Sequence, residues 1–236
     1  MTQIAIIVPV YNEEKILYDN INRLYEFLHL NLHSNFEIII LDSYSKDRTA
    51  EIAKSLVINN SKIKYLNIES PGKGGKIKKF VRNSDYDYYA FIDADLPISL
   101  DCFLLLVNSI MDNSTDLAIA SRYILGARSH RKISRKIASK VYNSLLNLLC
   151  DIPTHDAFAG AKAWNKKIKS EVWPKVNNLE WFFDTELIYY TAKYNYDIKE
   201  IPVIYNDFRS DSKVHLLRDS FRIGKALLGF LLTKQK

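Results

Sequence analysis

Short apolar runs alternate with amphipathic stretches through the first half of the chain. Five of the runs predict buried β-strands, at residues 4–10, 36–42, 63–68, 88–92 and 117–121. The stretches between them predict helices at 14–32, 47–57, 73–81 and 99–111. Strands that are apolar on both faces and separated by helices are typical of βαβ units. We therefore predict an α/β fold, with a mostly parallel sheet covered by helices on both faces.

The second half of the chain is predicted to be more helical. Helices are expected at 133–149 and 183–194, then a strand at 198–204 and a last helix at 214–232. An apolar residue recurs every four positions in the first of these helices, which we interpret as core packing: Ile133, Ile137, Val141, Leu145 and Leu149. We predict one folded domain at 1–213 and a C-terminal basic amphipathic helix at 214–236.

Acidic residues follow the predicted strands, at the edge of the sheet where such folds bind ligands. Asp42 ends the second strand, and Asp93 and Asp95 follow the fourth. Two carboxylates separated by one residue can share a divalent cation whose other ligands are water and phosphate oxygens. A solvated turn is an equally common reading of an isolated Asp-x-Asp, because aspartate is frequent in turns.

A glycine-rich turn at 71–76 precedes the third predicted helix. It lacks the spacing and the hydroxyl residue of a nucleotide-triphosphate P-loop. The first strand leads into Tyr-Asn-Glu-Glu, where a dinucleotide-binding fold would place a glycine-rich turn. Both of these nucleotide-binding classes are therefore disfavoured.

Composition places the chain among ordinary globular proteins, with 47% hydrophobic and 25% charged residues. Its two cysteines lie in leucine-rich stretches, which excludes a disulfide framework and a cysteine-built zinc site. No apolar run approaches the roughly 18–20 residues of a membrane span. The first residues carry no basic region or cleavage site of a secretion signal. We therefore expect a cytoplasmic protein.

Positive charge is concentrated in two segments of the chain, whose net charge is +6. Residues 122–140 hold seven lysines and arginines and no acid, and a second basic segment begins at Arg209. Charge segregated in this way indicates an anionic partner for part of the surface. Nucleic acid, a membrane surface and a phosphorylated substrate all fit this description.

Nine motifs occur in one order along nearly the whole chain. The first five are VPVYNEE at 8–14, ILDSYSKDRT at 40–49, PGKGGK at 71–76, FIDADLP at 91–97 and ASRY at 120–123. Together they resemble family 2 glycosyltransferases of the GT-A fold. Four later motifs resemble the dolichyl-phosphate mannose or glucose synthases of that family: SRKIASKVYNSLLNLLCDI at 134–152, HDAFAGAK at 155–162, FFDTELIYYTAKYNYDIKEIPV at 182–203 and SKV at 212–214.

This resemblance implies an inverting, metal-dependent hexosyltransferase. The donor would be a nucleotide sugar, GDP-mannose or UDP-glucose, and the acceptor a polyprenyl or dolichyl phosphate. The cofactor would be Mg²⁺ or Mn²⁺ on the donor diphosphate. The motif that usually reads D-D-G-S is Asp42-Ser43-Tyr44-Ser45 here, so the sequence leaves the choice between the two donors open.

Motif positions assign roles to individual residues of this chain. The resemblance implies nucleotide-binding roles for Pro9, Tyr11, Glu13, Asp42 and Lys73. It places the metal and the diphosphate at Asp93, Ala94 and Asp95, with Asp95 favoured as the direct ligand. A solvated loop lysine is an equally good reading of Lys73.

Basic and acidic residues of the later motifs receive the remaining roles. The resemblance places Arg122 and Arg135 near the diphosphate and the acceptor phosphate, and lets Arg209 and Lys213 close over the donor. Asp184 belongs to a motif on the acceptor side of the site. Glu186 shares that motif, although it could instead cap or pair with a helix neighbour.

A membrane surface is the expected partner, because a polyprenyl acceptor cannot leave the bilayer. The helix at 214–232 combines Arg218, Arg222 and Lys225 with a leucine-rich end, as interfacial helices do. We expect an enzyme bound peripherally to the cytosolic face, with a membrane protein as a further candidate partner. A soluble or glycan acceptor is the alternative. Binding to nucleic acid would not explain the acidic strand ends, so no such partner is expected.

Overall fold

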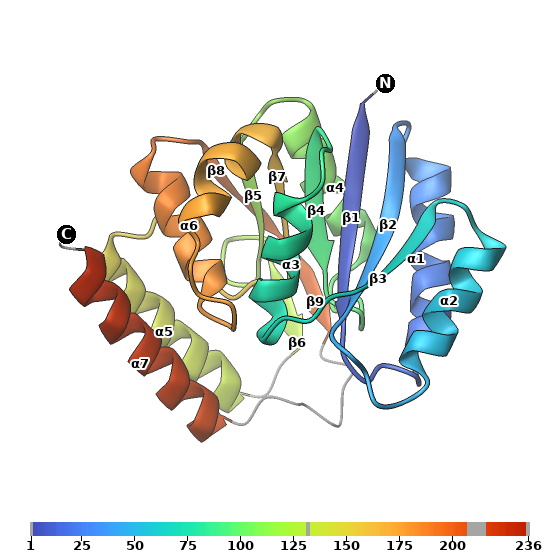
Figure 1. The fold of residues 1–236 in the computed structure, drawn as a ribbon. Coiled ribbons are helices and arrows are strands. Elements are labelled where there is room, and N and C mark those ends of the chain that lie inside the picture. Colours follow the sequence, from blue (N-terminus) through green and yellow to red (C-terminus); the bar gives the residue numbers. More distant parts are fainter. Residues whose placement is uncertain (1, 131–132, 207–215, 235–236) are drawn as a thin grey trace.

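A seven-stranded sheet forms the centre of the protein in a computed structural model that describes residues 2–130, 133–206 and 216–234 (Figure 1). The strands follow the order β3-β2-β1-β4-β7-β5-β8 across the sheet. Their bounds are β1 Gln3–Val10, β2 Asn35–Asp42, β3 Ile63–Asn67, β4 Tyr88–Ile92, β5 Leu117–Ser121, β7 Ala161–Asn165 and β8 Ile198–Pro202. All five strands predicted in the first half of the chain are present.

Parallel pairing brings the strand ends that carry polar residues to one edge. β1 pairs with β2 and β4 in parallel, and the register sets Val10 opposite Asp42. The central strand is fully buried from Ile4 to Val8, because helices cover both faces of the sheet (Figure 1). The α/β fold with a mostly parallel sheet is therefore confirmed.

One central strand, β7, was not predicted from the sequence. β7 runs antiparallel between β4 and β5, with Lys162 opposite both Phe91 and Ile119. A lysine in the middle of Ala161–Asn165 breaks the apolar run by which a buried strand is recognised. The predicted strand at 198–204 is also divided: β8 ends at Pro202, and Ile204–Asn206 forms β9, which pairs with β6 at Arg128–His130.

The helices lie close to their predicted positions. Their bounds are α1 Leu17–Asn31, α2 Thr49–Asn59, α3 Gly72–Arg82, α4 Leu100–Met111, α5 Ile133–Cys150, α6 Phe183–Lys193 and α7 Leu216–Lys234. Ser99 caps α4 by accepting a hydrogen bond from the backbone N–H of Cys102. The glycine-rich stretch is the first turn of α3 rather than a turn before it, which corrects the prediction.

The apolar stripe of α5 faces outward, so its interpretation as core packing is wrong. Ile133, Ile137 and Val141 are 74%, 59% and 55% exposed, and the stripe continues through Leu145, Leu148 and Leu149. The buried face of α5 carries Asn143, Leu146 and Cys150 instead. This helix is therefore polar in part on its inner side and apolar on its outer side, the reverse of an ordinary surface helix.

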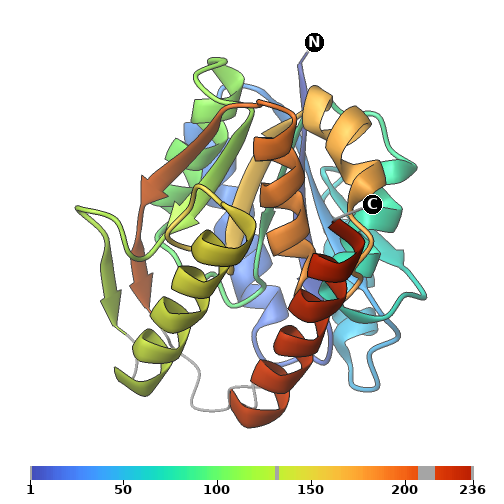
Figure 2. The same ribbon diagram turned by 90° about the vertical axis from the view of Figure 1, so that its left-hand side faces the viewer.

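α7 lies beside α5 at the side of the molecule away from α1 and α2 (Figures 1 and 2). Its inner face packs through Phe230, whose ring lies 4.9 Å from that of Tyr189 and 5.5 Å from that of Phe182. Leu228 and Leu232 are exposed on its outer face. The division predicted at 213/214 falls outside the described residues. Within the described ranges, no helix combines the length and apolar character needed to cross a membrane.

Candidate active site at the carboxyl ends of the strands

The pair Asp93 and Asp95 lies directly after β4 and is held by the backbone around it. The N–H of Asp93 donates to the carbonyl of Gly160 at 3.1 Å, and the carbonyl of Ala94 accepts from Asn20 Nδ2 at 2.8 Å. Leu96 adopts a left-handed backbone, with φ of 45°, that turns the chain away from the pair. Both carboxylates are half-buried at the edge of the sheet.

This donor set suits a hard divalent cation that is also held by a substrate. No third histidine, cysteine, aspartate or glutamate joins the pair within the part of the chain that the structure describes. Mg²⁺ characteristically takes one or two protein carboxylates and fills its remaining positions with water and substrate phosphate oxygens. The pair therefore fits a metal that arrives with a diphosphate, and does not resemble a closed structural metal site.

Lys73 occupies one side of the acid pair. Its Nζ lies 2.6 Å from Oδ1 of Asp93 and 4.2 Å from the centre of the Phe91 ring. The Lys73 side chain is only 14% exposed, so the reading of Lys73 as a solvated loop residue is wrong. Asp93 is thus neutralised by a fixed cation within the chain, at the place where a diphosphate is expected.

α3 can bring Lys73 to this position because its first turn contains glycines. A Cβ on Gly74 would lie 2.6 Å from Cγ of Phe183, and a Cβ on Gly75 would lie 2.1 Å from Oγ of Ser70. The helix therefore approaches α6 and the preceding loop more closely than alanine would allow. Lys76, one turn on, donates to the carbonyl of Val10 at 2.7 Å and fixes α3 to the end of β1.

The loop after β1 is fastened to the loop after β2. The N–H groups of Asn12 and Glu13 donate to Ser45 Oγ at 2.9 Å and Thr49 Oγ1 at 2.7 Å. Pro9 is half-buried and Tyr11 is 43% exposed beside this junction. Pro9, near the end of β1, and Tyr11 and Glu13, in the loop after it, therefore lie at the same edge of the sheet as the acid pair.

Asp42 has partners within the chain. It is fully buried, and its carboxylate accepts from Ser45 Oγ at 2.6 Å and Tyr65 Oη at 3.0 Å. Burial and the neighbouring Asp42 charge raise the pKa of Tyr65 to about 12. Asp42 therefore joins the loop after β2 to β3, and its contact with a base or ribose stays a prediction.

Arg122 has a different partner from the phosphates expected for it. Its guanidinium forms a two-pronged ion pair with Asp156, at 2.7 and 2.6 Å, and donates to the carbonyl of Phe158 at 3.0 Å. Both charged groups are buried. The pKa of Arg122 is raised well above its usual value, because Asp156 outweighs the effect of burial. Arg122 thus holds a loop, and its contact with a phosphate stays a prediction.

Asp184 forms a second buried ion pair. Its Oδ1 lies 2.6 Å from Nζ of Lys162, and neither side chain is more than 4% exposed. Burial raises the pKa of Asp184 and lowers the pKa of Lys162, and each partner opposes the shift of the other. Asp184 therefore neutralises Lys162 within the core. The sequence did not identify Asp156 as the partner of Arg122, nor did it indicate that Lys162 is fully buried.

Glu186 binds the backbone of the loop before α6, and does not cap a helix. Its Oε2 accepts from the backbone N–H groups of Asn177 and Asn178, at 2.5 and 2.8 Å. The segment 177–182 that it fixes also meets α3, because the N–H of Gly75 donates to the carbonyl of Leu179 at 2.7 Å. Glu186 thus supports the glycine-rich turn from a distance.

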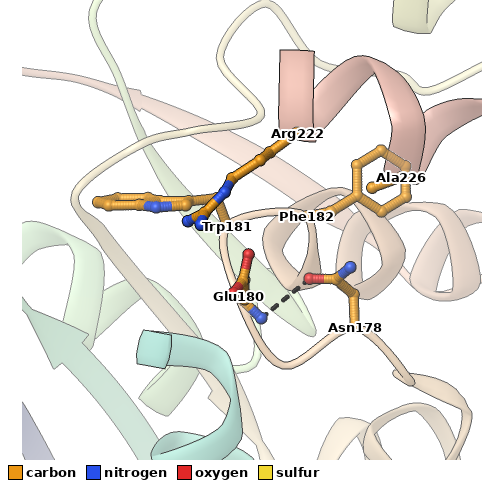
Figure 3. Close-up of a pocket in the computed structure, with 6 residues that line it drawn as sticks. All are labelled: Asn178, Glu180, Trp181, Phe182, Arg222 and Ala226. Atoms are coloured by element: carbon orange, nitrogen blue, oxygen red, sulfur yellow. Dashed lines mark hydrogen bonds between the residues drawn. The ribbon is translucent and has the colours of Figure 1, made fainter. Parts of the chain in front are cut away.

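A small pocket lies between this segment and α7. Figure 3 shows the Arg222 side chain reaching from α7 toward the Trp181 ring, above Glu180. The lining residues are Asn178, Glu180, Trp181, Phe182, Arg222 and Ala226. The pocket therefore joins the C-terminal helix to the segment that supports α3.

Three residues assigned from the sequence have side chains outside the described part. Arg209 and Lys213 belong to the range 207–215, which the structure does not describe. Arg135 lies in the first turn of α5, but its side chain is also outside the description. The roles expected of all three stay predictions.

Comparisons with known proteins agree on a family. The sequence profile of glycosyl transferase family 2 matches residues 5–173. AglD, a glycosyltransferase of Haloferax volcanii, is 25% identical over 228 residues, which are 96% of this chain and 36% of AglD. The dolichyl-phosphate beta-glucosyltransferase of Dictyostelium discoideum is 29% identical over 243 residues, which are 95% of this chain and 72% of that protein. The chain thus spans about a third of AglD's length.

The fold is shared with solved structures of distant sequence. Glucosyl-3-phosphoglycerate synthase from Mycobacterium tuberculosis, crystallised with UDP, superposes with a TM-score of 0.74. The alignment has 16% identity and covers 98% of this chain and 79% of that chain. A further structure of the synthase, with a TM-score of 0.72, contains Mn²⁺, UDP and glucosyl-3-phosphoglycerate.

Proposed function

The chain belongs to glycosyl transferase family 2, and we propose that it transfers a hexose from a nucleotide sugar to the phosphate of a dolichyl or polyprenyl lipid. Relatives named dolichyl-phosphate beta-glucosyltransferases support this acceptor and favour glucose as the hexose. UDP-glucose is the donor that we propose, and GDP-mannose is the competitor to be tested against it.

The main support for a lipid acceptor is the exposed apolar face of α5. The outer face of α5 is apolar over its whole length, and the loop that follows α5 is hydrogen-bonded to Asp93 through Gly160. The helix that carries this apolar face is therefore connected to the acid pair through a single loop of the chain. A soluble or glycan acceptor would give no reason to expose six large aliphatic side chains along one helix.

The donor diphosphate would be held by Asp95 and Lys73, with the loop at 9–13 around the nucleotide. A bound Mg²⁺ or Mn²⁺ would neutralise negative charge on the leaving diphosphate. Asp95 is our direct ligand, as the resemblance to the Asp-x-Asp motif of the family implies. Lys73 is placed to contact the diphosphate as well, because an ammonium group has three donors.

The acceptor would need no protein base. The second pKa of a phosphate monoester is about 6, so the acceptor is an oxyanion at neutral pH. The site must instead supply positive charge to bring this dianion beside an anionic donor. We assign that task to Arg135, Arg209 and Lys213, and give Asp184 a supporting role through Lys162. In-line attack then inverts the anomeric carbon.

We propose that α5 and α7 lie on an anionic, cytosolic membrane surface. α5 contains no acidic residue, and Lys136 and Lys140 flank its apolar stripe. Arg222 and Lys225 accompany the exposed leucines of α7. Interfacial helices bind in this way, with apolar side chains inserted and basic ones at the headgroups. The membrane contact expected of α7 and of the basic segment 122–140 thus extends along the apolar face of α5.

The test is a donor screen with the purified chain. Nucleotide release and lipid-linked hexose would be measured with UDP-glucose or GDP-mannose, Mn²⁺ and a short-chain polyprenyl phosphate. We expect transfer from UDP-glucose, loss of transfer in excess EDTA, and loss by orders of magnitude in Asp95→Ala. Transfer to a free sugar or to phosphoglycerate, with none to the lipid phosphate, would reject the lipid acceptor.

A further inference from the structure

The loop His155–Gly160, here called the clamp loop, lies between α5 and β7 and is bound by side chains from α5, β7, β8 and the end of β5. On β8, the carboxylate of Glu200 accepts from the N–H of His155 at 3.0 Å. Nδ2 of Asn143, on α5, donates to the carbonyl of His155 at 2.7 Å. Oδ1 of the same side chain accepts from the N–H of Ala157 at 3.2 Å. Both the nitrogen and the oxygen of this buried side-chain amide thus hold the loop.

Lys162, on β7, binds the same loop from the other side. Its Nζ donates to the carbonyls of Ala157 and Ala159, at 3.0 and 3.2 Å, and to Asp184 at 2.6 Å. These three bonds match the three donors of an ammonium group. Arg122, at the end of β5, completes the set through Asp156 and the carbonyl of Phe158.

Such an arrangement is a poor way to gain stability. Taking charged groups out of water costs free energy that their mutual attraction barely offsets, and apolar residues of similar volume often serve as well. Two buried ion pairs and a buried amide around one short loop therefore indicate that the position of the loop matters.

The far end of the clamp loop touches the acid pair. The carbonyl of Gly160 accepts from the N–H of Asp93 at 3.1 Å, and a Cβ on Gly160 would lie 2.9 Å from Oδ2 of Asp93. The near end follows the C-terminal end of α5 after residues 151–154, and the opposite end of this helix contains Arg135 in its first turn. One loop therefore connects the acid pair to the helix that we assign to the acceptor.

We infer that the clamp loop fixes the acceptor helix relative to the acid pair, and that Asn143 is the positioning residue that sets this distance. The inference rests on the proposed function, because it concerns transfer to the lipid phosphate. Asn143 itself touches neither donor nor acceptor in this account. Its removal would leave donor binding intact and misplace the nucleophile.

The test compares two reactions of the same donor. Asn143→Leu keeps the side-chain volume and removes both hydrogen bonds to the loop. Transfer to a short-chain polyprenyl phosphate and hydrolysis of UDP-glucose would be measured with Mn²⁺, for wild type, for this variant and for Ser144→Ala, an exposed control on α5. We expect transfer to fall about 100-fold, the cost of a misplacement of roughly 1 Å, with hydrolysis and the donor KM changed by less than about threefold.

Asn143→Ala provides a second variant if the leucine variant does not fold. It removes both hydrogen bonds to the loop without placing an apolar branch against the two backbone groups, so it should also lose transfer selectively. Equal losses of transfer and hydrolysis, or transfer unchanged, would overturn the inference. A wild-type enzyme that hydrolyses UDP-glucose but never uses the lipid phosphate would instead reject the proposed function.

Discussion

Lys73 lies 2.6 Å from Asp93, within an ion pair at the start of α3 and the end of β4. The pair joins the glycine-rich turn to the first acid of Asp-Ala-Asp. It also separates the roles of the two acids, since Asp93 is already neutralised when a metal approaches. We propose that Lys73 competes with a divalent cation for Asp93 and contacts the donor diphosphate.

Replacing Lys73 should raise the KM for the donor and lower the Mn²⁺ concentration that gives half-maximal activity. In Lys73→Met, we expect the KM for the donor to rise about tenfold or more, because a charge-assisted hydrogen bond is worth roughly 1.5–3 kcal/mol. The Mn²⁺ concentration that gives half-maximal activity should fall, since Asp93 loses its competing cation. Initial rates over a grid of donor and Mn²⁺ concentrations provide both values. Lys79→Met, on the exposed side of α3, is the control, and a matching change in it would reject the assignment.

Gly74 should tolerate no side chain. A Cβ there would meet the Phe183 ring at 2.6 Å, so Gly74→Ala overpacks the contact between α3 and α6. Overpacking typically costs about 1–3 kcal/mol. Gly224→Ala is the matched change on α7, where a Cβ meets nothing within 4 Å and the better helix propensity of alanine favours stability. Urea unfolding should separate the two, and equal stabilities would show that the α3–α6 contact adapts.

Asp47 should make stability dependent on acid pH. Burial alone would raise its pKa, but hydrogen bonds from Thr49 and from the N–H of Glu14 hold the pKa below its usual value of 3.8. A carboxyl with a lowered pKa stabilises the fold above pH ~4, and this contribution is lost as the pH falls through the lowered value. Asp47→Asn should therefore melt below wild type at about pH 6, and the difference should narrow as the pH falls below ~4. Parallel melting curves of the two across this range would contradict the prediction, and Glu26→Gln is the exposed control.

The outer face of α5 should bind anionic vesicles. We expect the double variant Ile137→Asp/Val141→Asp to lose most cosedimentation with liposomes that contain phosphatidylserine, because it places charge in the apolar stripe. Leu228→Asp/Leu232→Asp tests α7 in the same way. Ile58→Asp alters an equally exposed side chain on α2 and should bind as wild type does. Salt should weaken the binding of wild type to the vesicles only in part. Binding that survives in both double variants would exclude the outer faces of α5 and α7 as the membrane-binding surface.

Much of the fold could be predicted because local pattern and burial agree. Ile4 to Val8 is apolar at every position, and a strand buried on both faces is the structure that such a run favours. The Asp93-Ala94-Asp95 pair was found for the same reason, since it directly follows a run of this kind. The position of this pair directly after a predicted buried strand was sufficient to identify it as a candidate site.

Other features depend on contacts between distant segments. The lysine in β7 is acceptable only because Asp184, 22 residues later, neutralises it within the core. Arg122 and Asp156 are 34 residues apart, and nothing local identifies them as partners. The stripe of α5 has ordinary core periodicity, and periodicity alone does not say whether protein or solvent faces it. Each of these errors thus arose where tertiary structure decides the environment of a residue.

The linkage of the transferred hexose tests the central claim most directly. A lipid phosphate that attacks an α-linked nucleotide sugar in line with the departing nucleotide must yield a β-linked product. The experiment is NMR of the lipid-linked hexose made by the purified chain from UDP-glucose, Mn²⁺ and a short-chain polyprenyl phosphate. We predict one β-linked glucosyl phosphate lipid. An α-linked product, or hexose attached anywhere but to the lipid phosphate, would contradict direct displacement by the phosphate.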